Sequence, residues 1–170
     1  MNAAKDSTRT HTGEGGPGPV VVLFDGVCNL CNGWVNWAID RDPRARILFL
    51  PQQTPAGAAL LADAGLGDVP LSTIVAIHGG RALVRSAAIL AVARALDGPW
   101  PRLATACRAV PAPLRDLVYR SIASIRYGVF GRSASCRVPT PALACHFLDP
   151  DDILAARSVA GFVGGKTVPV

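Results

Sequence analysis

The spacing of apolar residues changes repeatedly along the chain, and its first part predicts alternating strands and helices. Val20–Phe24 is an unbroken apolar run, which is typical of a strand buried on both faces. Asn29–Arg41 carries apolar residues at helical spacing, and Arg46–Leu50 is a second candidate strand. Because strands joined through a helix require a right-handed crossover, we expect these two strands to be parallel.

The pattern continues with a helix and a hairpin. Thr54 is suited to cap a helix at its first turn, and Gly65 is suited to end it. Leu71–Ile77 and Arg81–Val84 are candidate strands separated by Gly79-Gly80. A glycine pair between two strands is a hairpin signal, so we expect these strands to be antiparallel.

Further helices are expected after the hairpin. Ser86 is placed to cap an apolar helix over Ala87–Leu96. Leu114–Val129 has a single apolar stripe, with its charged residues on other sides. The order is β-α-β-α-β-β-α followed by helical segments. We expect a tail over 1–18, an α/β core over 19–98, a helical extension packed on the core over 99–160 and a loose tail over 161–170.

Composition narrows the class of protein. Half of the 170 residues are hydrophobic and 17% are charged, which excludes bulk disorder. No apolar run approaches the roughly 20 residues that a membrane-spanning helix needs, so we expect no integral membrane association. The first 19 residues lack the apolar stretch of a signal peptide, so we expect a cytoplasmic protein. Five cysteines in a reducing compartment are core filler, metal ligands or redox groups.

Positive charge is concentrated late in the chain. The 17 basic and 12 acidic residues give a net charge of +5, and the segment from Arg102 to Arg137 contains one acidic residue, Asp116. Such a surplus could meet nucleic acid or an anionic membrane surface. Aromatic residues for base stacking are few, however, and no nucleic-acid motif matches. A solvated helix face explains the charge more simply, so we expect no nucleic-acid partner.

The sharpest chemical feature is a C-x-x-C pair, Cys28 and Cys31, between the first strand and the first helix. One helical turn brings the two sulfurs close enough to bond. Cys28 is expected at the helix N-terminus, where free N–H groups and the helix dipole favour a thiolate. Asp25 works against this, because a nearby negative charge disfavours a thiolate.

This placement leads to a redox hypothesis. Cys28 would attack a substrate disulfide, and Cys31 would resolve the mixed disulfide. Asp25 would accept a proton from Cys31 or orient a water, although an Asp-Gly pair is also a common turn or cap. The reaction needs no bound cofactor, but an external thiol or reductase must recycle the dithiol.

Two other interpretations of the cysteines stay open. A zinc site would need further ligands, for which Cys136, Cys145 and His146 are candidates, although a sequence-adjacent pair suits one tetrahedron poorly. The dithiol could also be inert in a structural or protein-interaction domain. Cys107 lies in an apolar helical stretch and is expected to be core filler.

The D-x-x-C-x-L-C pattern resembles the DCC family of thiol-disulfide oxidoreductases, whose members are similar to thioredoxin in fold. The resemblance extends from about Val20 to Asp149. It rests on four blocks in order: Phe24–Cys31; Arg85–Ala88 with Leu96–Trp100; Tyr119–Arg126 with Tyr127, Phe130 and Gly131; and Cys136–Pro141 with Phe147 and Leu148. It implies a thioredoxin-like core over 19–98, and a redox role for Asp25, Cys28 and Cys31.

The resemblance also suggests partners and auxiliary residues. The implied partners are a disulfide- or dithiol-containing protein or a small thiol, and a recycling reductase. The residues that could form a cap beside the dithiol are Tyr119, Arg126, Tyr127, Cys136 and Arg137. In this cap Arg126 or Arg137 offsets Asp25, and Cys136 is a third redox thiol. The simpler interpretation pairs these arginines with carboxylates and packs the cysteine. If Pro70 is not the cis-proline of thioredoxins, Ser72 or Thr73 is expected to face Cys28.

Overall fold

The computed structural model describes residues 18–133 and 141–162. Four strands and the helices that cover them follow the predicted order. The elements are β1 (Val20–Phe24), α1 (Asn29–Ile39), β2 (Ile47–Pro51), α2 (Pro55–Asp63), β3 (Val75–His78), β4 (Arg81–Val84), α3 (Arg85–Ala95), α4 (Trp100–Cys107), α5 (Ala112–Phe130), the 3₁₀ helix η1 (Pro141–His146) and α6 (Ile153–Ala160).

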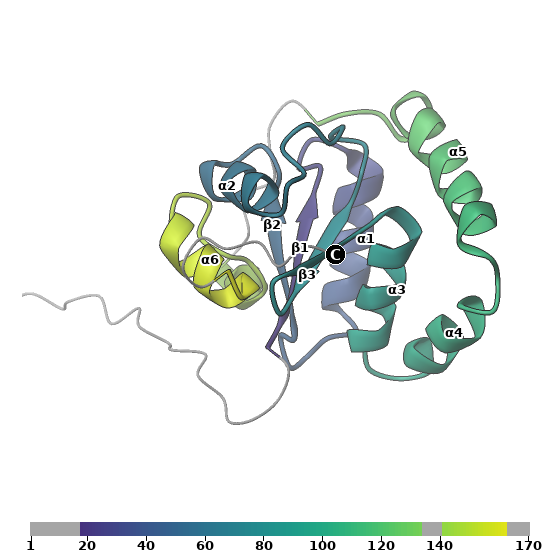
Figure 1. Cartoon of the computed structure of the whole chain (residues 1–170), viewed down its shortest axis with the longest axis horizontal. Coiled ribbons are helices and arrows are strands. Elements are labelled where there is room, and N and C mark those ends of the chain that lie inside the picture. The colour runs from purple at the N-terminus through teal and green to yellow at the C-terminus, as the bar shows by residue number, and fades with distance from the viewer. Residues whose placement is uncertain (1–17, 134–140, 163–170) are drawn as a thin grey trace, which may run out of the picture.

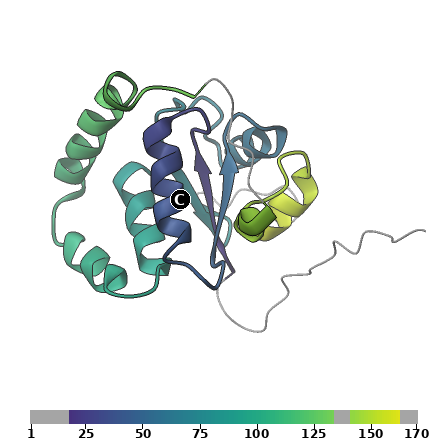
Figure 2. The same ribbon diagram turned by 180° about the vertical axis from the view of Figure 1, so that it is seen from behind.

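The sheet has the strand order β2-β1-β3-β4. β1 runs parallel to β2 and antiparallel to β3, and β3 forms an antiparallel hairpin with β4. Both strand-direction predictions are therefore confirmed. With α1 and α3 on one face and α2 on the other, the arrangement is thioredoxin-like (Figure 1; Figure 2).

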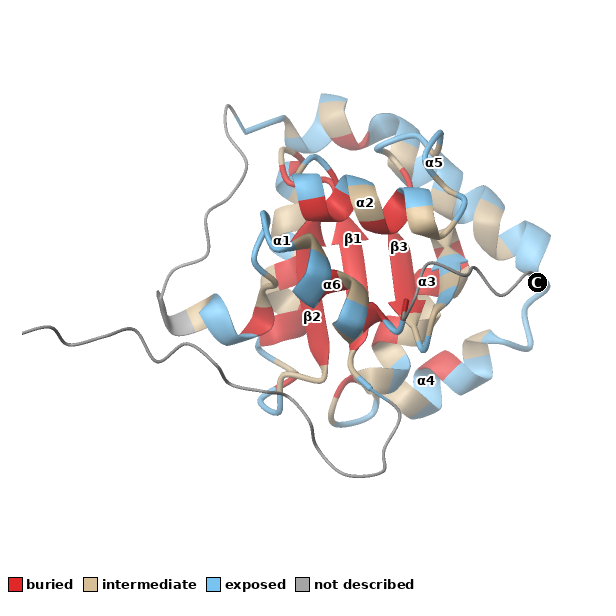
Figure 3. Cartoon of the chain, turned by 60° about the vertical axis from the view of Figure 1, so that its left-hand side comes forward, coloured by how far each residue is buried: buried red, intermediate tan, exposed pale blue. Residues whose placement is uncertain are grey.

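Alternate side chains of β1 point into two hydrophobic clusters, one on each face of the sheet. Val20, Val22 and Phe24 pack against α1 and α3, while Val21 and Leu23 pack against α2 and α6. All five residues of β1 are buried, as Figure 3 shows for the centre of the sheet. The sheet is therefore covered on both faces, and the carboxyl end of β1 is a rigid support for the residues that follow it.

Two predicted details are wrong. The third strand begins at Val75, not at Leu71, because Pro70–Thr73 forms a turn closed by a hydrogen bond from the Thr73 N–H to the Pro70 carbonyl. Ser86 does not cap the third helix. Helix α3 begins at Arg85, directly after β4, and Arg85 has a left-handed φ of 54°.

Helix α5 is attached to the core mainly through polar contacts. Asp116 accepts hydrogen bonds from the N–H and hydroxyl of Ser86, and this hydroxyl lowers the pKa of the Asp116 carboxyl. The Tyr119 hydroxyl bonds Ser72 and Ile74 in the loop before β3. Among the 19 residues of α5, Arg126 alone is buried. The Asp116 carboxylate thus accepts a backbone N–H in the first turn of α3, a role that the sequence had suggested for the Ser86 side chain.

The apolar stripe of α5 forms as predicted but stays largely exposed. Five of its residues are about half exposed: Leu114, Leu117, Val118, Ile122 and Ile125. In Figures 1 and 2, α4 and α5 together form an arm along the outer side of α3 and α1. None of the described helices is long and apolar enough to cross a membrane.

The last described residue, Phe162, is buried beside α6.

Candidate functional site

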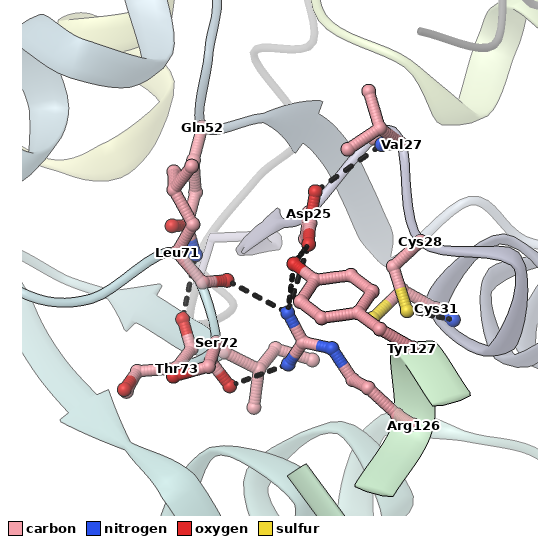
Figure 4. Close-up of polar contacts among 12 residues, drawn as sticks. Asp25, Val27, Cys28, Cys31, Gln52, Leu71, Ser72, Thr73, Arg126 and Tyr127 are labelled. Atoms are coloured by element: carbon pink, nitrogen blue, oxygen red, sulfur yellow. Dashed lines mark hydrogen bonds and ion pairs between the residues drawn. The ribbon is translucent and has the colours of Figure 1, made fainter. Parts of the chain in front are cut away.

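The two cysteines lie where β1 passes into α1. Cys28 is the N-cap residue of α1, and its sulfur accepts a hydrogen bond of 3.4 Å from the backbone N–H of Cys31. Both cysteines are free thiols, and their side chains lie next to each other (Figure 4). A sulfur at this position meets the free N–H groups and positive end of the helix, which stabilise a thiolate.

The two thiols differ in exposure. Cys28 is completely buried, whereas Cys31 is half-buried. Cys28 forms an isolated antiparallel bridge with Arg132, and the Ser133 N–H donates a 2.8 Å hydrogen bond to the Val27 carbonyl. We call residues 131–133 the strap. The strap follows α5 directly, so the end of the arm lies over the turn that carries Cys28.

Asp25 directly follows β1 and is buried. Its Oδ1 accepts hydrogen bonds from the Val27 N–H at 3.2 Å and from Gln53 Nε2 at 2.7 Å. Its Oδ2 accepts from Arg126 Nη2 at 2.8 Å and from the Tyr127 hydroxyl. The Val27 contact is the Asp-Gly turn that the sequence suggested. The other three donors come from distant segments and make the carboxylate the centre of a polar network.

Arg126 joins α5 to this network (Figure 4). Its Nη1 donates a 2.8 Å hydrogen bond to the carbonyl of Ser72, and its Nη2 donates to the Tyr127 hydroxyl as well as to Asp25. The side chains of Arg126 and Asp25 are 4% and 1% exposed, so water screens the pair little. The guanidinium also lies 4.4 Å from the centre of the Tyr127 ring.

The loop before β3 supplies backbone carbonyls to the site. Ser72 accepts from Arg126 and from the Tyr119 hydroxyl, and Gln52 Nε2 bonds the carbonyls of Thr73 and Leu23. Burial raises the pKa of Tyr119, which keeps its hydroxyl available as a donor at neutral pH. All peptide bonds of the described residues are trans, so Pro70 is not a cis-proline.

Burial and neighbouring groups raise the pKa of the Cys31 thiol. Burial, the hydrogen bond to Cys28 and the charge of Cys28 raise the pKa of Cys31 to about 12, with Asp25 adding to the effect and Arg126 opposing it. Burial works against the charged form of Arg126, but Tyr127 and the two cysteines outweigh it and raise its pKa. Cys31 therefore keeps its proton at neutral pH, and Arg126 stays charged beside the dithiol.

A cavity of about 710 Å³ opens beside Cys31 and Asp25. Its walls come from α1, α3, α4, α5 and the loop before β3, and they are mostly apolar. Ser72 and Arg126 line it near the dithiol, and Cys107 lines it from α4. Cys107 is half-buried and borders open space, so the expectation of simple core filler misses its position.

The structure thus brings together Asp25, Cys28, Cys31, Ser72 and Arg126, while Cys136 and Arg137 lie outside the described residues. Cys145 is exposed and His146 is buried in η1. Within 18–133 and 141–162, the His, Cys, Asp and Glu side chains form no group of three or more that could hold a metal ion.

Two hydrogen-bonding residues of the site were missed or placed only loosely from sequence. Gln53 bonds Asp25 and, through its Oε1, the N–H of Gly26. It follows β2, whose carboxyl end lies beside that of β1, so a polar residue at this position was a usable signal. Tyr127 was expected in a cap, but its bond to Asp25 depends on the approach of α5, which no local pattern reveals.

Comparisons with known proteins identify relatives of this chain. Residues 22–132 match the family model described as DCC1-like thiol-disulfide oxidoreductase. The chain is 44% identical over 128 residues to Uncharacterized protein YuxK of Bacillus subtilis (strain 168), covering 75% of this chain and 93% of that protein. It is 39% identical over 118 residues to DCC family protein At1g52590, chloroplastic, of Arabidopsis thaliana, covering 69% of each. No solved structure gives a significant match. The chain belongs to the DCC1-like thiol-disulfide oxidoreductase family.

Proposed function

We propose that the protein is a thiol-disulfide oxidoreductase in which Cys28 and Cys31 exchange electrons with a disulfide of a protein or a small thiol. The observation that carries this proposal is the asymmetry of the two thiols. The Cys28 sulfur accepts an N–H at the start of α1, whereas the raised pKa of Cys31 keeps that thiol protonated. A nucleophile and a resolving thiol have different tasks, and the two cysteines have correspondingly different surroundings.

The reaction proceeds in two exchanges. The Cys28 thiolate attacks one sulfur of the substrate disulfide and forms a mixed disulfide, and the other substrate sulfur leaves as a thiolate that takes up a proton. Cys31 then loses its proton and attacks the Cys28 sulfur. This step forms the Cys28–Cys31 disulfide and releases the second substrate thiol. Two electrons have passed to the substrate, and an external thiol or reductase returns them to the protein.

Asp25 serves the second exchange in this proposal. It lines the same cavity as Cys31, and it accepts the Cys31 proton through water in that cavity. Arg126 and Tyr127 hold the carboxylate in place. Arg126 also favours the Cys31 thiolate once the proton has left, because its charge lowers the pKa of that thiol.

The buried position of Cys28 adds a requirement. We propose that a disulfide reaches its sulfur when the strap moves away from Val27 and Cys28. The strap is held there by the Ser133 hydrogen bond and the bridge to Arg132, both of which are backbone contacts near the surface. Opening at such a site costs far less than global unfolding.

The test is a redox titration followed by mass spectrometry, with the metal content measured on the same sample. We expect the reversible loss of two hydrogens and no stoichiometric metal. Cys28→Ser and Cys31→Ser should both abolish turnover, and Cys31→Ser alone should trap a mixed disulfide. Full activity of Cys28→Ser would overturn the proposal. Stoichiometric zinc without redox change would also overturn it, in favour of a structural metal-binding domain.

Asp25→Asn tests the proton transfer separately. Loss of the Asp25 charge lowers the pKa of Cys31, so a purely electrostatic Asp25 predicts faster resolution of the mixed disulfide in the variant. A proton acceptor predicts slower resolution. We expect the single-turnover rate of resolution to fall by about 10²-fold or more, as is usual when a positioned base is lost. A rate equal to or above the wild-type value would remove Asp25 from the proton path.

A further inference from the structure

The cavity beside the dithiol has walls that suit apolar side chains. Leu30 and Trp34 of α1 and Ile89 of α3 form one side, while Val118 and Ile122 of α5 form the other. Cys31 and Asp25 line it, so an occupant of the cavity is held next to the thiol of Cys31. A volume of about 710 Å³ is within the usual range of roughly 300–1,000 Å³ for ligand sites.

The lining offers little to a charged ligand. Asp25 and Arg126 neutralise each other in a buried ion pair. The remaining charged residue, Arg115, donates from Nε to the Val110 carbonyl and is partly exposed. A small thiol such as glutathione carries carboxylates and an ammonium group, which would lose their hydration in the cavity without gaining partners. Apolar side chains would gain from the same transfer.

We propose that this cavity binds an apolar segment of a polypeptide substrate beside the disulfide that the dithiol reduces, which rests on the function proposed above. Among the substrates open to that function, the cavity selects proteins over small charged thiols. The cavity holds the substrate side chains that flank the substrate's reacting cysteine. These side chains need not contact the dithiol itself.

The charge of the arm, which forms part of the cavity wall, narrows the class of substrate further. Arg108, directly after α4, and Arg120 of α5 are exposed, and Arg115 is partly exposed. The one carboxylate among the residues of α4 and α5, Asp116, is bonded to Ser86. The arm therefore presents positive charge to an approaching chain. Segments flanked by acidic or neutral residues fit this charge, and Lys- or Arg-rich segments are repelled.

The experiment compares substrates with one disulfide ring and different flanks. Three synthetic peptides carry the same two cysteines with flanks of Leu and Val, of Ser and Gly, or of Leu and Lys, and glutathione disulfide is the small reference. We expect kcat/KM to be about tenfold higher for the Leu and Val peptide than for the Ser and Gly peptide. Burying two further methylene groups gives this ratio. The Lys peptide should fall below the Leu and Val peptide.

Matched variants of α5 locate the effect. Val118→Ser with Ile122→Ser changes the cavity wall, and Leu117→Ser with Ile125→Ser changes equally exposed residues that do not line it. Because all four side chains are about half exposed, neither change removes core packing. We expect the first pair to bring the Leu-Val to Ser-Gly ratio of kcat/KM close to one, mainly through KM. The second pair should leave the ratio unchanged.

The outcomes separate this inference from the function beneath it. If glutathione disulfide and all peptides fail to turn over, the proposed function itself is wrong. If the wild-type protein reduces the peptides but its kcat/KM is the same for the Leu-Val and the Ser-Gly peptide, the cavity proposal alone is overturned. A third outcome would also overturn the cavity proposal. The protein would bind vesicles of anionic lipid, the Leu117→Ser with Ile125→Ser variant would lose this binding, and the Leu-Val to Ser-Gly ratio of kcat/KM would not respond to Val118→Ser with Ile122→Ser. This outcome would assign the arm to a membrane surface.

Discussion

The guanidinium of Arg126 lies 2.8 Å from the carboxylate of Asp25, although the two residues are 101 positions apart in the sequence. This buried pair joins the last turns of α5 to the end of β1, one residue before the turn that leads to the dithiol. It unites the two roles that the sequence left open for Arg126. The residue pairs with a carboxylate, and its charge also acts on the thiol of Cys31.

Arg126→Met should destabilise the protein by about 3–5 kcal/mol, because it leaves the Asp25 carboxylate buried without its cation. Urea unfolding followed by circular dichroism measures this change. The double variant Asp25→Asn with Arg126→Met should recover a large part of the loss, since neither charge is then left alone. A single variant as stable as the wild-type protein would mean that the pair contributes nothing.

The ionisation of Cys31 should depend on Cys28. In the wild-type protein the rate of Cys31 alkylation by iodoacetamide should rise only toward pH 12, because its pKa is about 12. Cys28→Ser removes the charge of Cys28, so the pKa of Cys31 should move down toward the ordinary value of 9.0. Burial persists in the variant and should keep the pKa above that value. An unchanged pH profile would contradict the coupling of the two thiols.

The strap should control access to Cys28. Ser133→Pro removes the N–H that bonds the Val27 carbonyl, whereas Ser133→Ala keeps it. A lost hydrogen bond of about 1 kcal/mol corresponds to a roughly fivefold larger open fraction. We therefore expect Cys28 to be alkylated about fivefold faster in the proline variant, measured by peptide mass spectrometry, and at the wild-type rate in the alanine variant. Equal rates in both would show that another contact covers the thiol.

Two glycines should respond oppositely to alanine. A methyl group at Gly57 of α2 would collide with the Pro51 carbonyl and come within 3.1 Å of the Gln52 Cα. This crowding at the end of β2 should destabilise the protein by about 1–3 kcal/mol. Gly33 is exposed in α1, and a methyl group there meets nothing within 4 Å. Because alanine favours a helix more than glycine does, Gly33→Ala should raise the free energy of unfolding by about 0.5–1 kcal/mol. Thermal unfolding of both variants checks the two signs.

The features that the sequence predicted well are those set by neighbouring residues. The apolar run of β1 and the position of Cys28 at the start of α1 follow from local pattern. Ser86 was assigned as a cap on the same grounds, but β4 runs directly into α3, and a carboxylate from α5 takes the place of a local cap. Local signals cannot reveal a partner that tertiary structure brings from 30 residues away.

The burial of Cys28 and the exposure of the α5 stripe were also beyond the sequence. Arg132 and Ser133, about a hundred positions later, pair with the backbone of Cys28 and Val27. The spacing of Val118 and Ile122 identifies one face of a helix but not what lies opposite it, which here is a cavity. Helical periodicity indicates which side chains share a face. How far that face is buried depends on how the whole chain packs around it.

Arg126 is also the single buried anchor of a long helix, and the sulfurs are among the groups that favour its charge. A Cys28–Cys31 disulfide cannot ionise, so oxidation removes any thiolate charge from beside the guanidinium. Oxidation should therefore loosen the hold on α5 and reduction should tighten it. The resistance of α5 to proteolysis would then depend on whether the dithiol in the interior is reduced or oxidised.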